Sequence, residues 1–216
     1  MDNEAFLDGL RQHPLLAIIR GTGLKATVAT AQVLLEEGFR YVEVALTTPG
    51  ALHAIEAISA SAGPECVIGG GTVMTEGDVK DVISAGARFA VTPAVVDSIS
   101  HCARRNLPVL AGAFTATEAV TAMAMGAAGI KLFPVSAVGP RYIRALREPL
   151  PHIPFLAVGG VDASSVPEYL AAGATALGVG SPLIGDAAAG GDLEELRLRA
   201  RNFLQMLPAP APETGG

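Results

Sequence analysis

The sequence predicts a closed barrel of eight parallel strands that alternate with helices, preceded by one extra helix. Short apolar runs recur eight times along the 216 residues, and Ala- and Leu-rich segments with helical spacing separate them. Strands that alternate with helices pair in parallel, through right-handed crossovers. A closed (β/α)8 barrel, the TIM barrel, uses all eight runs and leaves no strand edge exposed. An open, doubly wound α/β sheet is the alternative fold.

The expected strands are short and nearly evenly spaced. They are LLAIIR (15–20), YVEVAL (41–46), VIGGGT (67–72), FAVTP (89–93), PVLAGA (108–113), GIKLFP (129–134), FLAVGG (155–160) and ALGVGS (176–181). A glycine follows several of the intervening helices, where the chain needs a left-handed residue, in EEGFRYVEV, SAGARFAVTP, AMGAAGIKLF and AAGATALGVG. We expect residues 1–14 to form the extra helix, residues 1–207 a single domain, and residues 208–216 a disordered Pro/Gly-rich tail.

Composition argues against several classes of protein. A net charge of −6 without a basic cluster disfavours a nucleic-acid partner. No apolar run reaches the roughly 18 residues of a membrane span, and the acidic N-terminus does not resemble a signal peptide. We therefore expect a cytoplasmic protein that binds no membrane, with Cys66 and Cys102 as reduced structural thiols. Four histidines without ligand spacing disfavour a metal site.

Alternation along the second strand places a carboxylate inside the barrel. In YVEVAL, Val42, Val44 and Leu46 share one face, and Glu43 lies on the other. The all-apolar face is expected to meet the helices, so Glu43 points inward. Active sites of this fold lie at the C-terminal ends of the strands, where an inward carboxylate can act on a bound molecule.

Lys131 is one of only three lysines, and it lies in GIKLFP, an otherwise apolar strand. If Ile130 and Leu132 meet the helices, Lys131 and Phe133 point into the barrel. A buried ammonium is costly unless it is paired, or neutral and reactive. One interpretation is an interior ion pair with Glu43, a weak stabilising device because desolvation offsets the attraction. The pattern favours the other, a lysine that forms a Schiff base while the carboxylate shuttles protons.

Glycines at the ends of the last two strands predict a phosphate site. AVGGV (157–161) ends the seventh strand, and GVGS (178–181) ends the eighth. Barrels often bind phosphate between these loops, on backbone N–H groups that glycine leaves accessible, and Ser181 would add a hydroxyl donor. Arg20 ends the first strand and Thr72 the third, after a further glycine run that is expected to clear room for a substrate.

Together these motifs resemble the Schiff-base aldolases of 2-keto-3-deoxy-6-phosphogluconate and 2-keto-3-deoxy-6-phosphogalactonate (KDPG and KDPGal). The resemblance covers nearly the whole chain, and its specific pieces are AIIRG, YVEVAL, GGGTV, FAVTPAV, IKLFPVSAVGP and AVGGV. It implies a (β/α)8 barrel, a lyase activity that yields pyruvate, no metal and no organic cofactor, and a homotrimer.

The resemblance also implies a role for each candidate residue. Lys131 would form the imine with the keto group of the substrate, and Glu43 would transfer protons. The remaining residues would surround the substrate: Arg20 binds it, Thr72 lies near the pyruvyl carboxylate, Pro93 and Phe133 wall the site, and Gly159, Gly160 and Ser181 bind the phosphate.

Two departures from the KDPG pattern favour the KDPGal branch. Thr47 stands where the KDPG branch has an arginine for the substrate carboxylate, and Val158 stands where it has a threonine before the paired glycines. The run SAVGPRYIRAL also resembles the KDPGal branch. The missing arginine means that Arg20 or backbone donors would have to hold the carboxylate.

The sequence therefore predicts a class I aldolase that cleaves 2-dehydro-3-deoxy-6-phosphogalactonate into pyruvate and D-glyceraldehyde 3-phosphate. The gluconate epimer or 4-hydroxy-2-oxoglutarate as substrate is an alternative within the same chemistry. Two alternatives belong to other classes. One is a phosphate-binding barrel isomerase or epimerase in which Glu43 is the base and Lys131 an electrophile. The other is a non-catalytic barrel that binds a sugar phosphate.

Overall fold

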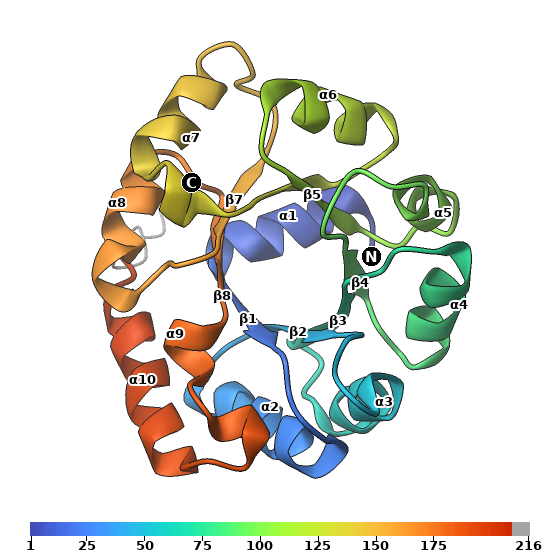
Figure 1. Ribbon diagram of the computed structural model, residues 1–216, viewed down its shortest axis with the longest axis vertical. Coiled ribbons are helices and arrows are strands. Elements are labelled where there is room, and N and C mark those ends of the chain that lie inside the picture. The colour runs from blue at the N-terminus through green and yellow to red at the C-terminus, as the bar shows by residue number, and fades with distance from the viewer. Residues whose placement is uncertain (209–216) are drawn as a thin grey trace, which may run out of the picture.

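The computed structural model of the protein describes residues 1–208, and it is a closed barrel of eight parallel strands surrounded by helices (Figure 1). The strands follow one another in chain order, and the first pairs with the last. This closure confirms the predicted barrel and excludes the open sheet. Of the expected tail, residues 209–216 lie outside the described residues.

The strands of the barrel are four or five residues long, apart from one of three. They are β1 Leu15–Ile19, β2 Tyr41–Ala45, β3 Val67–Gly71, β4 Phe89–Val91, β5 Val109–Ala113, β6 Gly129–Leu132, β7 Phe155–Val158 and β8 Ala176–Val179. Most end one or two residues before the predicted end. The candidate residues at the predicted strand ends therefore lie on the loops that follow, except Ser181, which begins a helix.

Helices precede the barrel and follow its strands. They are α1 Asn3–Gln12, α2 Leu24–Glu37, α3 Ala51–Ser61, α4 Glu76–Ser84, α5 Ser98–Arg104, α6 Ala116–Ala124, α7 Pro140–Arg147, α8 Val166–Ala171, α9 Ser181–Ile184 and α10 Leu193–Gln205, with single 3₁₀ turns at Val135–Ala137, Ala163–Ser165 and Ala187–Ala189. No helix within residues 1–208 is both long and apolar enough to cross a membrane.

Local signals in the sequence set where several helices begin and end. Thr75 and Thr115 cap α4 and α6, each in a capping box with the carboxylate three residues later. The four predicted glycines at helix ends all have a positive φ, which a residue with a side chain rarely adopts; they are Gly38, Gly86, Gly126 and Gly173. These signals explain why the helix–strand junctions could be read from the sequence.

The apolar core has two layers, one between the strands and the helices and one inside the barrel. Val42, Val44, Ile130 and Leu132 belong to the cluster between strands and helices, as the alternation predicts. A separate cluster fills the barrel interior and includes Leu16, Tyr41, Phe89, Leu110, Leu156 and Val158. The interior is therefore a packed core, as is usual for this fold.

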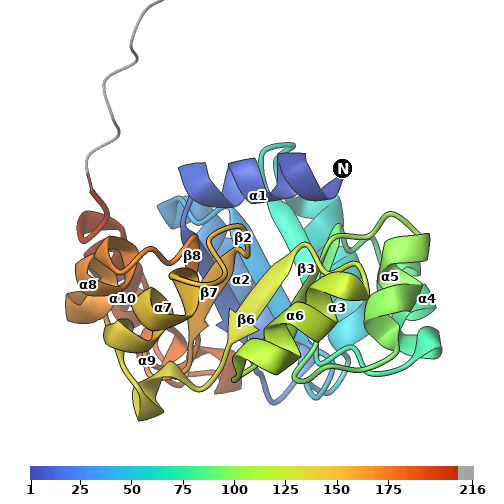
Figure 2. The same ribbon diagram turned by 90° about the horizontal axis from the view of Figure 1, so that it is seen from above.

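Helix α1 closes the barrel at the N-terminal ends of the strands, and Figure 2 shows it lying across that end. Phe6 and Leu10 of α1 are fully buried and belong to the interior cluster. The ring of Phe6 packs against Tyr41 and Phe89, at centroid distances of 5.8 and 5.3 Å. Within residues 1–208, α1 thus leaves the opposite end of the barrel, where the strands finish, for a bound molecule.

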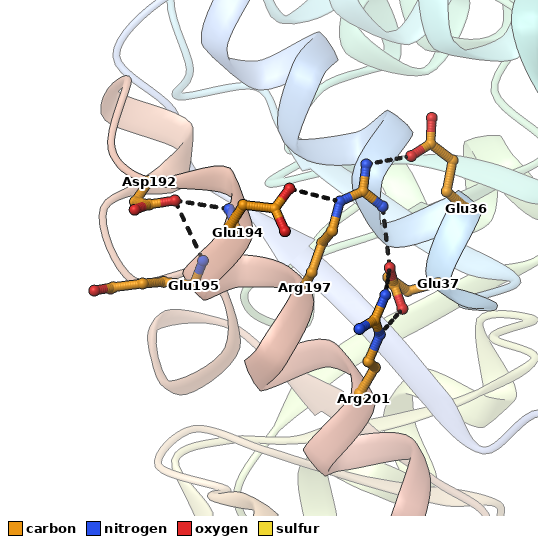
Figure 3. Close-up of polar contacts among 7 residues, drawn as sticks. All are labelled: Glu36, Glu37, Asp192, Glu194, Glu195, Arg197 and Arg201. Carbon is orange, nitrogen blue, oxygen red and sulfur yellow. Dashed lines mark hydrogen bonds and ion pairs between the residues drawn. The ribbon is translucent and has the colours of Figure 1, made fainter.

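Ion pairs join the last helix to the second helix, which lies beside it (Figure 3). Arg197 of α10 contacts Glu36 at 2.6 Å and Glu37 at 3.0 Å, and Arg201 contacts Glu37 at 2.7 Å. The Glu37 side chain is only 9% exposed. Hydrogen bonds from Arg201 and then Arg197 hold the pKa of Glu37 below the ordinary value of a glutamate. This contact completes the ring of helices around the barrel.

Glu37→Gln is expected to remove a stabilisation that depends on pH. A carboxyl group whose pKa is lower in the folded state than in the unfolded state stabilises the folded protein. The stabilisation is complete above the unfolded-state pKa of about 4.3, and it is lost as the pH falls through the folded-state pKa. The melting temperature of the variant should therefore lie below that of the wild type at pH 7, and the gap should narrow below about pH 4. Glu36→Gln, at a mostly exposed position with one arginine contact, is the matched control and should cost less. A gap independent of pH would contradict this assignment.

Candidate active site

The candidate residues gather at the end of the barrel opposite α1. Glu43 and Lys131 lie within β2 and β6, and Val158 is the last residue of β7. The others follow a strand end within two residues; they are Arg20, Thr72, Pro93, Phe133, Gly159, Gly160 and Ser181. Since parallel strands all end at the same side of a barrel, the fold brings the whole set to one opening.

Glu43 is fully buried, and neither carboxylate oxygen has a hydrogen-bond partner among residues 1–208. Its neighbours in register are Ile18 on β1 and Gly69 on β3, which offer no side-chain donor. A buried carboxylate without a partner is costly, and such groups are rare in folded proteins. Its position is consistent with a group that serves a bound molecule.

Lys131 is 5% exposed, and it too lies between residues without side-chain acceptors, Gly112 on β5 and Leu156 on β7. Its Nζ lies 5.8 Å from the centre of the Phe133 ring. Among residues 1–208 no ion pair within 4.0 Å involves Lys131, so the interior ion pair with Glu43 is absent from this structure. The amine and the carboxylate are both buried in the barrel but do not contact each other.

The three glycines of β3 each make room for a different neighbour. Gly69 faces the ring of Phe89, Gly70 faces Val82 on α4, and a Cβ at Gly71 would overlap the carboxylate of Glu43. The sequence suggested that this run clears space for a substrate. The structure shows instead that the glycines accommodate protein side chains, among them the carboxylate of Glu43.

Thr72 directly follows these glycines and has a φ of 61°. A β-branched residue in the left-handed region is a genuine outlier, and such strain persists only where the surroundings enforce it. No hydrogen bond of the Thr72 side chain is formed within residues 1–208, and the residue is only partly buried. The strained backbone therefore presents a free hydroxyl beside the opening of the barrel.

The ends of β7, β8 and β1 meet at the predicted phosphate site. Gly159 and Gly160 both have positive φ, and Gly159 packs against Phe133 while Gly160 packs against Ser136. The side chain of Arg20, directly after β1, reaches the end of β8. Its guanidinium lies 3.9 Å from the position that a Cβ on Gly180 would take. The exposed Ser181 follows Gly180 directly. Arginine, backbone glycines and a hydroxyl are thus held at one side of the opening.

Two buried threonines that sequence reasoning missed hold the neighbouring loops. Thr48 accepts a hydrogen bond of 3.1 Å from the Gly21 N–H, next to Arg20. Thr92 donates to the Ala94 carbonyl at 2.7 Å and accepts from the Gly112 N–H at 3.3 Å. The first of these bonds joins the two residues that flank Pro93 in the sequence. Both threonines closely follow a strand, and the sequence shows this position. It does not show which atoms they bond, because two of the three partners lie 20 and 27 residues away.

The cysteines and the acidic residues outside this site do not form a second centre in the described part of the chain. Burial raises the pKa of the Cys102 thiol to about 12, and burial also raises the pKa of Cys66. Neither thiol is therefore a good nucleophile at neutral pH. Within residues 1–208 no group of three or more His, Cys, Asp or Glu side chains is arranged to hold a metal ion.

The family model for KDPG and KHG aldolases matches residues 7–197 of the chain. The chain belongs to this aldolase family. It is 36% identical to the 2-dehydro-3-deoxy-6-phosphogalactonate aldolase of Escherichia coli (strain K12) over 194 residues, which cover 89% of this chain and 93% of that protein.

Two solved structures show the same architecture. A native KDPGal structure is 35% identical, with a TM-score of 0.84, over 89% of this chain and 93% of that one. The KDPG aldolase of Legionella pneumophila, in which pyruvate was captured as a covalent carbinolamine, is 26% identical, with a TM-score of 0.77, over 93% and 95% of the two chains. The protein is therefore an aldolase, and so a lyase.

Replacing Thr72 of this aldolase should separate stability from activity. A left-handed conformation costs a residue with a side chain about 1–2 kcal/mol, and glycine would avoid this cost. The greater freedom of glycine in the unfolded chain offsets about 0.5–1 kcal/mol of that gain in stability. Thr72→Gly should thus keep or raise the free energy of unfolding by about 1 kcal/mol while it lowers kcat/KM. Thermal unfolding and aldol-cleavage assays measure the two effects, and Thr72→Ser is the control that keeps the hydroxyl. Unchanged kcat/KM in Thr72→Gly would show that the strain serves no substrate contact.

Proposed function

We propose that the protein is a class I aldolase that cleaves 2-dehydro-3-deoxy-6-phosphogalactonate into pyruvate and D-glyceraldehyde 3-phosphate. The observation that carries this proposal is Lys131, a buried amine on the inner side of the barrel without a counter-ion among residues 1–208. Such an amine is not held by a carboxylate and can act as the nucleophile that forms an imine with a ketone. The carbinolamine captured in the Legionella relative supports the same chemistry.

Lys131 attacks the C2 ketone of the substrate, and the carbinolamine loses water to give an iminium. When the C3–C4 bond breaks, its electron pair moves into the iminium and forms a neutral enamine, so no free carbanion is required. Protonation of the enamine and hydrolysis of the resulting imine then release pyruvate and restore Lys131. Each step requires a group that accepts and returns protons.

Glu43 is the proton carrier in this proposal. Its carboxylate is buried and makes no hydrogen bond within residues 1–208, so it is free to accept a proton from the substrate. It assists the loss of water from the carbinolamine, removes the proton of the C4 hydroxyl during cleavage, and later protonates the enamine. Such general acid–base catalysis contributes about 10²–10⁴-fold to the rate.

The remaining residues bind and orient the substrate. Gly159, Gly160, Ser181 and Arg20 hold the phosphate, since the guanidinium lies beside the β8 end that carries Ser181. Thr72 offers its free hydroxyl to the pyruvyl carboxylate, and Pro93 and the half-exposed Phe133 wall the opening. Phosphate binding far from C2 positions the reacting bond with energy from a remote contact.

The galactonate epimer is proposed as the substrate on two grounds. Identity is 36% with the Escherichia coli KDPGal aldolase, 30% with the KHG/KDPG aldolase of the same organism and 26% with the Legionella KDPG aldolase. Val158 also lies in the interior cluster, 4% exposed and against Gly178 of β8, and its side chain can form no hydrogen bond. The gluconate epimer and 4-hydroxy-2-oxoglutarate are the alternatives within this chemistry.

A homotrimer, on the strength of the family resemblance, and a cytoplasmic location, on the strength of the composition, also belong to this proposal. Sedimentation of the purified protein tests the first, and fractionation of cells tests the second.

Borohydride reduction in the presence of pyruvate tests the proposed imine. Reduction should attach a stable pyruvyl adduct to the peptide that contains Lys131. Lys131→Arg should abolish the adduct, because arginine keeps the charge but forms no imine. Mass spectrometry of the digested protein locates the label. An adduct on Lys25 or Lys80, or none at all, would overturn the assignment, and the second result would favour an isomerase or a non-catalytic barrel.

The preference between epimers is expected to depend on Val158. The two substrates differ only at C4, and a site without a polar partner discriminates by shape, which is worth about 1–3 kcal/mol, or roughly 10–200-fold. We expect the wild type to favour the galactonate epimer and Val158→Thr, similar in shape but with a hydroxyl, to shift kcat/KM toward the gluconate epimer. Both kcat/KM values are measured for both proteins. A ratio that the substitution leaves unchanged would remove Val158 as a determinant.

A further inference from the structure

Gly71, the last residue of β3, lies against the carboxylate of Glu43 on the neighbouring strand. We propose that Gly71 is the positioning residue of this carboxylate: its missing side chain leaves the space in which Glu43 carries protons. The inference rests on the proposed function for the role of Glu43, and on the geometry of β2 and β3 for the role of Gly71.

The strand register explains why the space at Gly71 is the one that Glu43 occupies. Glu43 is in register with Gly69, and Gly71 lies two residues further toward the opening of the barrel, on the same inward face. The ring of Phe89 already fills the space beside Gly69. The carboxylate therefore leans along β3 toward the opening and comes to rest over Gly71.

Within residues 1–208, packing and no hydrogen bond holds the carboxylate in this place. Neither oxygen of Glu43 has a hydrogen-bond partner within residues 1–208, so no donor there fixes its orientation. A Cβ on Gly71 would overlap Oε1 and lie 2.6 Å from Cδ and 2.8 Å from Cγ of Glu43. The whole end of the side chain would have to move, by about an ångström or more. A misplacement of about 1 Å can cost about 10²-fold in rate.

Gly70 provides a matched control on the same strand. It faces outward, and its Cβ would meet Val82 on α4 instead of Glu43. Neither Gly70 nor Gly71 has a positive φ, so alanine carries no left-handed penalty at either residue. Gly70→Ala and Gly71→Ala both crowd β3, but only Gly71→Ala displaces the carboxylate.

The experiment compares two reactions of pyruvate in these variants. Borohydride trapping after equilibration reports how much imine forms on Lys131, and that amount does not depend on how fast Glu43 assists the loss of water. Exchange of the pyruvate methyl protons with solvent deuterium instead measures the rate of proton transfer by Glu43. We expect Gly71→Ala to retain trapping and to lose about 10²-fold in exchange. Gly70→Ala should retain both reactions, even if its melting temperature falls.

A double-substitution cycle shows whether Gly71 acts through Glu43. Adding Gly71→Ala to Glu43→Ala, which has no carboxylate to displace, should cause no further loss of exchange and no further fall in melting temperature. An exchange rate in Gly71→Ala equal to that of the wild type would overturn the inference. So would a finding that Gly71→Ala lowers the exchange rate or the melting temperature by the same amount in the wild type and in Glu43→Ala.

The same measurements separate this inference from the proposed function. If the wild-type protein forms no imine with pyruvate, the proposed function fails. The melting temperatures of the cycle then decide by themselves whether Gly71 sets the place of the Glu43 side chain. If the imine forms but the effects of Gly71→Ala and Glu43→Ala simply add, the proposed function stands and the role of Gly71 is rejected.

Discussion

An amine and a carboxylate lie inside the same apolar barrel without pairing, and much of the architecture around them follows from this constraint. An ion pair between Lys131 and Glu43 would satisfy both groups electrostatically, but it would also occupy the amine and the carboxylate that the proposed reaction needs. The strands instead place the two groups on β2 and β6, with Gly112 and Leu156 beside the lysine and Ile18 and Gly69 beside the glutamate. The desolvation that results is unfavourable for stability and favourable for reactivity.

The rest of the barrel offsets that cost. Apolar side chains fill both layers of the core, and fully buried Phe and Leu side chains of this kind typically contribute several kcal/mol each. Arginine–glutamate contacts between α10 and α2 close the ring of helices far from the opening. The strained backbone of Thr72 is another local cost beside the site. Stabilising apolar contacts thus surround the reactive groups, and the ion pairs lie on the outer ring of helices.

The barrel and its inward residues could be predicted because they depend on short-range rules. Alternation along a strand was enough to place Glu43 and Lys131 inside, and the glycines after the helices marked the junctions. The roles of Gly71, Thr48 and Thr92 could not be predicted, because each depends on which atom of a neighbouring strand or loop lies opposite. The Gly21–Thr48 contact joins residues 27 apart, and the overlap of Gly71 with Glu43 depends on the register of two strands. Spacing in the sequence carries no information about either.

The position of α1 has a consequence for the order of events in a catalytic cycle. Because Phe6 and Leu10 fill the far end of the barrel, molecules enter and leave through a single opening. On the proposed reaction, the phosphorylated aldehyde lies nearer that opening, and pyruvate stays covalently attached to Lys131 further in. The aldehyde must then depart before the enamine is protonated and pyruvate is hydrolysed from the enzyme. Product release is therefore sequential, and in the reverse direction pyruvate has to bind before the aldehyde.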